Sequence, residues 1–161
     1  MTQLYGLVDT ARDPRLYDWV VASPEHACLF SGDLAPAMER VLPYIVKLEA
    51  AAPIWDIWRQ VGWGQNWGMI CSSAGALTEV RNHFRRFLQV QLPDGEVVQF
   101  RFYDPRVWRT FTRTCTSEDL APWFDGVGEY WVETADGEGA LRYSFPAGGP
   151  PSVTQHGPPG G

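Results

Sequence analysis

Two aspartates and two arginines are the residues of this chain that could do chemistry together: Asp9, Arg12, Arg101 and Asp104. Each aspartate follows an apolar run typical of a β-strand and precedes a turn that begins at a proline. If the two strands are neighbours, the four side chains meet at one edge of a sheet. Paired carboxylates could then act as catalytic acids or metal ligands, which would suit a small hydrolase or phosphate-handling enzyme. More often an aspartate in this position caps a helix and pairs with an arginine, so we interpret the four as a structural constellation.

Other patterns typical of catalysis or metal binding do not occur in the sequence. The three histidines, His26, His83 and His156, are far apart, and the three cysteines form no CxxC pair. Cys71 precedes two serines after a predicted strand, but the glycines that flank a nucleophile elbow are missing. The sequence therefore predicts no catalytic residue, no metal, no cofactor and no enzyme, with reduced thiols as in the cytosol.

Charge and hydropathy exclude two classes of partner. The chain has 161 residues, a net charge of -6 and a single lysine, Lys47, whereas binding to a nucleic-acid backbone needs clustered cations. The apolar runs are too short to span a bilayer, and the first residues do not resemble a secretory signal. We therefore expect a cytoplasmic protein with neither a nucleic acid nor a membrane as partner.

The elements that position these residues follow from hydrophobic periodicity. Apolar runs predict strands over residues 4–8, 27–30, 44–48 and 69–72, and helical spacing predicts helices over 14–22, 53–60 and 74–87. Alternating residues around Pro93-Asp94-Gly95 predict a β-hairpin over residues 88–103, with Phe100 or Phe102 facing the core. A second hairpin is predicted over residues 130–145.

This order of elements predicts an α/β (α+β) fold, in which several helices pack on a mixed β-sheet and the C-terminal part forms hairpins. Residues 1–145 are expected to form one domain. Residues 146–161 are rich in proline and glycine and have few apolar side chains, so we expect a disordered tail there.

Tryptophan and arginine, which are enriched at protein interfaces, are frequent in this chain. There are eight tryptophans, and the arginines are concentrated between Arg81 and Arg113. The candidate partner-binding residues are Trp63 and Trp67 in a glycine-rich turn, and Arg85 and Arg86 on the polar side of a helix. For each of them a structural role, in the core or on a solvated face, is the alternative.

Several segments resemble a known family. They are Leu7–Pro14, Trp63-Gly64 through Trp67-Gly68, His83–Leu88, Leu92–Gly95, Phe100–Val107, Cys115 and Tyr130-Trp131. The sequence resembles, over about residues 4–133, small bacterial proteins that act as adaptor chaperones for type VI secretion effectors. The resemblance implies that the protein binds the N-terminal region of an effector (a toxin) in the cytosol and helps to load it onto the VgrG spike. It implies no catalytic residues.

Overall fold

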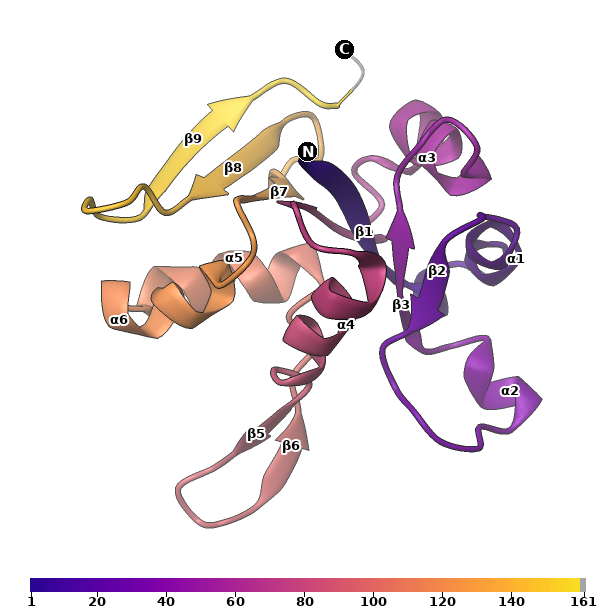
Figure 1. Cartoon of the computed structure of the whole chain (residues 1–161), viewed down its shortest axis with the longest axis horizontal. Coiled ribbons are helices and arrows are strands. Elements are labelled where there is room, and N and C mark those ends of the chain that lie inside the picture. Colours follow the sequence, from indigo (N-terminus) through magenta and orange to yellow (C-terminus); the bar gives the residue numbers. More distant parts are fainter. Residues whose placement is uncertain (160–161) are drawn as a thin grey trace.

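The computed structural model describes residues 1–159, which form one large antiparallel sheet with helices on both faces (Figure 1). The sheet has seven strands in the order β2-β3-β1-β4-β7-β8-β9. Their bounds are β1 Gln3–Asp9, β2 His26–Cys28, β3 Pro43–Lys47, β4 Gly68–Ser73, β7 Glu129–Glu133, β8 Ala140–Ser144 and β9 Ser152–His156. Every pairing in this sheet is antiparallel. The expected α+β class is confirmed, although the sheet is antiparallel and not mixed as expected.

The helices begin where the sequence supplies helix-starting residues. Pro105 is the first residue of α5, and the Asp104 side chain before it accepts a hydrogen bond from the Arg106 amide. The α-helices are α1 Leu16–Val21, α2 Pro36–Glu39, α3 Pro53–Ile57, α4 Leu77–Arg85, α5 Pro105–Thr114 and α6 Ser117–Leu120. Short helical turns are η1 Thr10–Arg12, η2 Trp58–Gly62, which continues α3 with π-helical geometry, and η3 Ala121–Phe124.

Alternation along the strands divides the core between the two faces of the sheet. On the first face, Tyr5 and Leu7 of β1 and Tyr130 of β7 pack with α4, α5 and η3. On the second face, Val8 of β1 and Ile70 of β4 pack with α1, α3 and η2. Two hydrophobic layers therefore lie on either side of one sheet.

The second face is covered unevenly. Its buried cluster draws on β1, β3 and β4, and β7 adds the partly buried Trp131. Among the described residues, β8 and β9 contribute no side chain to this cluster, although Leu141 and Tyr143 of β8 belong to the core of the first face. The second face is consequently open over the β7–β9 half of the sheet.

The hairpin predicted over residues 88–103 forms, but it is shorter than expected and does not belong to the main sheet. It consists of β5 Gln89–Gln91 and β6 Val97–Gln99, a separate pair that projects from the body of the molecule (Figure 1). The expectation that its alternating residues face the core is wrong for these strands, whose side chains are mostly exposed. Phe102 is fully buried, but it lies beyond the end of β6. Residues 88–99 are called the hairpin arm below.

The expectation of a disordered tail from residue 146 is also wrong. Residues 152–156 form β9, which pairs with β8 from Ser144↔Ser152 to Ala140↔His156. The strand has little apolar surface to bury, so its order depends on backbone hydrogen bonds along β8. Proline pairs at 150–151 and 158–159 limit it to this short window because proline cannot donate to a ladder. Residues 160–161, the end of that predicted tail, lie outside the described chain.

Within residues 1–159, no helix is both long enough and apolar enough to cross a bilayer.

Candidate functional site

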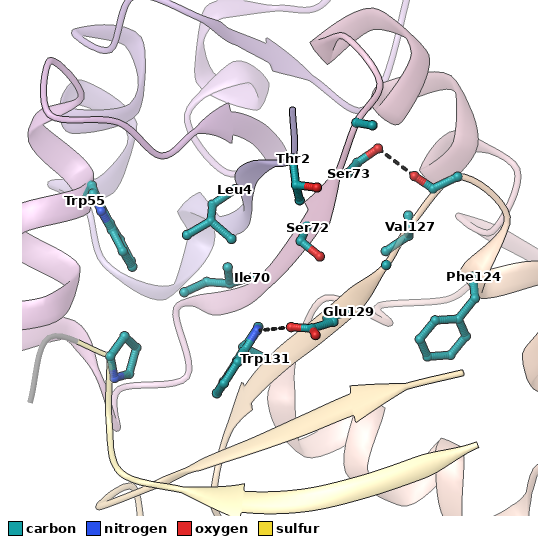
Figure 2. Close-up of a pocket in the computed structure, with 14 residues that line it drawn as sticks. Thr2, Leu4, Trp55, Ile70, Ser72, Ser73, Phe124, Val127, Glu129 and Trp131 are labelled. Atoms are coloured by element: carbon teal, nitrogen blue, oxygen red, sulfur yellow. Dashed lines mark hydrogen bonds between the residues drawn. The ribbon is translucent and has the colours of Figure 1, made fainter. Parts of the chain in front are cut away.

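A cavity of about 860 Å³, which we call the sheet groove, lies on the second face over β1, β4 and β7. Apolar and aromatic side chains supply most of its surface (Figure 2). The lining residues are Thr2, Leu4, Trp55, Ile70, Ser72, Ser73, Ala74, Phe124, Gly126, Val127, Gly128, Glu129, Trp131 and Pro159. A concave apolar surface of this size is typical of a binding site.

Strand register brings the floor of the sheet groove together. Ile70 of β4 is opposite Gly6 of β1 on one side and Trp131 of β7 on the other. Leu4 and Ser72 are also paired across β1 and β4, so their side chains share this face. In Figure 2, Leu4 and Ile70 lie between Trp55 of α3 and Trp131.

One wall of the sheet groove is formed by residues 124–128, and hydrogen bonds hold this segment against β4. The Ser73 hydroxyl donates to the Gly126 carbonyl at 2.6 Å, and the Gly128 amide donates to the Ser72 carbonyl at 2.8 Å. Both carboxylate oxygens of Glu129 accept hydrogen bonds. Oε1 accepts from Arg142, and Oε2 accepts from the indole Nε1–H of Trp131 at 3.2 Å. The Arg142 bond is the main cause of a lowered pKa at Glu129. The groove therefore offers a fixed apolar surface with a charged margin.

The constellation predicted from sequence is assembled only in part. The Asp9 carboxylate pairs with Arg101, and its Oδ1 accepts from the Ala11 amide at 3.1 Å. Asp104 pairs with Arg106 instead, at 2.8 Å. The expectation that two neighbouring strands bring these residues together is wrong, because Arg101 follows β6, which lies outside the main sheet.

Arg12 makes no ion pair in the described residues, but its charge contributes to the electrostatics at Asp104. Burial acts to raise the pKa of Asp104, yet the bonds from Arg106, helped by Arg12, hold that pKa below its ordinary value. Burial, together with the nearby charge of Asp9, raises the pKa of Tyr103 to about 12.

Both oxygens of the Asp9 and Asp104 carboxylates accept hydrogen bonds from the chain itself. For Asp104, Oδ1 accepts from the Arg106 backbone and Nε, and Oδ2 accepts from Nη2. Both residues are buried, with relative exposures of 1% and 6%. Such carboxylates cap helices and fix arginines, which supports the structural interpretation of the constellation.

The glycine-rich turn is attached to the β7–β8 hairpin by Glu133, a residue that sequence reasoning missed. The buried Glu133 carboxylate accepts from the amides of Gly64 and Asn66, each at 2.9 Å. Burial raises the pKa of Glu133, although the hydrogen bonds from these two backbone amides act to lower it. The only sequence signal was an acidic residue at a buried position of an alternating strand.

Trp63 and Trp67 therefore lie in a docked loop. Trp63 is half-buried and donates its indole N–H to the Gly139 carbonyl at 2.9 Å. Trp67 is 4% exposed and packs 5.9 Å from the Trp19 ring, so it lies in the core and not on a contact surface. Partner binding through Trp63 stays a prediction.

Arg85 and Arg86 are exposed at the end of α4, near the base of the hairpin arm. Arg85 donates to the Ser31 hydroxyl at 2.6 Å, and Arg86 donates to His83 Nδ1 at 2.9 Å. The arm beside them exposes Val90, Leu92 and Val97. Exposed apolar side chains next to exposed arginines suit a contact surface, and partner binding by these arginines stays a prediction.

Metal-ligating and thiol chemistry find no support among residues 1–159. No group of three or more His, Cys, Asp or Glu side chains there could hold a metal ion. The thiols of Cys28, Cys71 and Cys115 are free, and burial raises the pKa of each. These thiols are protonated at neutral pH and poorly nucleophilic.

Comparison with known proteins gives one match. A family model described as "Domain of unknown function (DUF4123)" matches residues 4–121. No curated protein and no solved structure matches the chain.

Proposed function

Because the chain belongs to the DUF4123 family, we propose that it is an adaptor chaperone that binds a type VI secretion effector in the bacterial cytosol. In this role it assists loading of the effector onto the VgrG spike. The family match extends from β1 through α6 and therefore includes four of the seven strands of the large sheet, β1 to β4, together with helices α1 to α6.

The observation that carries the proposal is the sheet groove. An apolar cavity of about 860 Å³ on an uncovered sheet face can bury a segment of another protein. Its floor and walls are held by strand pairing and by the bonds of Ser73 and Gly128, so little ordering is needed on binding. We therefore assign the groove to a segment of the effector.

The competing hypothesis is a small hydrolase that uses Asp9 and Asp104. Acid or base catalysis requires a carboxylate oxygen within reach of substrate, and metal binding requires one with an open lone pair. Both carboxylates are buried and already accept hydrogen bonds from arginines and backbone amides. Neither carboxylate is available for catalysis or for binding a metal, which counts against the hydrolase and supports the adaptor.

Co-expression with the toxin encoded by the neighbouring gene tests the proposal. The wild-type protein should raise the soluble yield of the toxin and co-purify with it. Leu4→Glu places a charge on the floor of the groove and should abolish co-purification. Val153→Glu makes the same change on β9 outside the groove, at a side chain that is 53% exposed, and should retain the toxin.

Circular dichroism must first show that both variants fold. If the folded wild-type protein retains neither a neighbouring toxin nor a spike protein, the adaptor function is wrong. If folded Leu4→Glu retains the toxin as well as the wild type does, the effector binds elsewhere.

A further inference from the structure

A proline of the chain itself lines part of the sheet groove. After β9 the chain passes Gly157 and Pro158, and Pro159 then forms part of the groove lining. Pro159 is partly buried there, whereas Pro158 is exposed. The same lining contains three aromatic side chains, Trp55, Phe124 and Trp131. Grooves lined by aromatic side chains are the sites at which extended proline-containing segments are recognised.

The floor of the groove disfavours an added β-strand. Its residues lie on β1, β4 and β7, which are interior strands whose backbone groups pair with neighbours on both sides. A strand laid on this face would find few partners for its amide groups, and unpaired buried amides are costly. Proline has no amide hydrogen, and a polyproline II segment makes no internal hydrogen bonds that the face must replace.

The polar part of the lining matches the groups that such a segment keeps. A proline-containing segment retains carbonyl acceptors but has few donors. The lining includes the hydroxyl-bearing Thr2 and Ser72, which can donate to a carbonyl. In Figure 2 the Ser72 side chain lies among the groove residues, near Leu4 and Ile70. The groove thus combines aromatic walls with hydroxyl donors.

We propose that the sheet groove binds an extended, proline-containing segment of the partner, and that the chain's own Pro159 covers part of the groove until the partner displaces it. That the partner is a secretion effector rests on the proposed function, whereas the ligand chemistry of the groove does not. An internal occupant lowers the apparent affinity for the partner by the fraction of molecules in which the groove is open.

Titration with decaproline tests this, followed by the indole N–H signals of Trp55 and Trp131 in NMR spectra of the full chain. Trp55→Phe and Trp131→Phe assign the two signals. Decaproline should shift both signals in the wild-type protein. In the variant P158S/P159S it should bind more tightly, by about threefold or more. An alanine-rich helical peptide of the same length should shift neither signal.

Three results would overturn the inference. The ligand class is wrong if decaproline leaves both signals unmoved in P158S/P159S, or if the helical peptide binds more tightly than decaproline. Displacement of the tail is wrong if the two proteins bind decaproline with the same Kd. If the protein retains the toxin but does not bind decaproline, this inference is rejected and the adaptor function stands. If it binds decaproline but retains no toxin, the adaptor function is rejected and this inference stands.

Discussion

The carboxylate of Asp9 pairs with the guanidinium of Arg101, two residues that are 92 positions apart in the chain. Asp9 ends β1 in the centre of the large sheet, and Arg101 follows the hairpin arm. The Asp9 side chain is 1% exposed and that of Arg101 is 52% exposed. The pair therefore attaches the segment after the arm to the sheet, with one partner buried and the other at the surface.

Replacement of Arg101 should destabilise the fold by more than the loss of a surface charge does. Arg101→Ala leaves a buried carboxylate without its charged partner, and we expect a loss of about 1–3 kcal/mol in the free energy of unfolding. Access of water to the arginine side keeps the loss below that of a fully buried pair. Urea denaturation measures it, with Arg113→Ala at an exposed site as the control. Equal losses in the two variants would show that the pair contributes nothing.

The docked glycine-rich turn predicts a difference between two glycine substitutions. Gly64 and Gly95 both have positive φ, at 93° and 90°, so alanine at either should cost about 1 kcal/mol or more in conformational strain. A Cβ at Gly64 would also lie 3.0 Å from the Gly137 carbonyl oxygen, whereas one at Gly95 would meet nothing within 4 Å. Gly64→Ala should therefore lower the melting temperature more than Gly95→Ala. If Gly95→Ala lowered the melting temperature more, the close approach of the Gly64 turn to the Gly137 turn would be contradicted.

The position of the hairpin arm predicts opposite outcomes for two nearby apolar residues. Phe102 is 0% exposed and stacks on Phe84, so Phe102→Ala should reduce stability by about 3–5 kcal/mol. Val97 on β6 is 58% exposed, so Val97→Ala should change it by less than about 0.5 kcal/mol. Chemical denaturation of both variants tests this, and a large loss in Val97→Ala would mean that the arm packs against the body.

His83 should make stability depend on pH. Its Nε2 lies 3.1 Å from the Trp123 carbonyl and its Nδ1 accepts from Arg86 at 2.9 Å, which requires the neutral ring with its proton on Nε2. Burial lowers the pKa of His83, and the Arg86 charge adds to that effect. As the pH falls below about 6.5, the unfolded histidine takes up a proton while the folded one does not. The free energy of unfolding should therefore fall with pH, by at most about 1.4 kcal/mol per pH unit.

His83→Gln removes the titrating ring but keeps an amide that can donate to the Trp123 carbonyl. Its stability between pH 6.5 and 5, the window just below the ordinary histidine value of 6.5, should depend less on pH than that of the wild type. The same slope in both proteins, measured by denaturation at several pH values, would show that His83 does not titrate differently on folding.

Sequence by itself determined the local elements of this protein. Short apolar runs located β1 and the strands of the β7–β8 hairpin, helical spacing located α4, and Pro93-Asp94-Gly95 located the turn of the arm. These signals are local because side-chain direction repeats with the backbone geometry of each element. The sequence also singled out Asp9, Arg12, Arg101 and Asp104 as one constellation, but it did not determine which carboxylate pairs with which arginine.

Only the tertiary structure decided how the elements are used. Alternation in residues 88–99 is the same whether a hairpin lies in a core or projects from it, because periodicity does not encode what covers a face. The pairing of β9 depends on the free edge of β8, which is formed by residues 140–144. The composition of residues 146–161 alone therefore could not predict it. The sheet groove is likewise non-local, since Leu4, Ile70 and Trp131 become neighbours only through strand register.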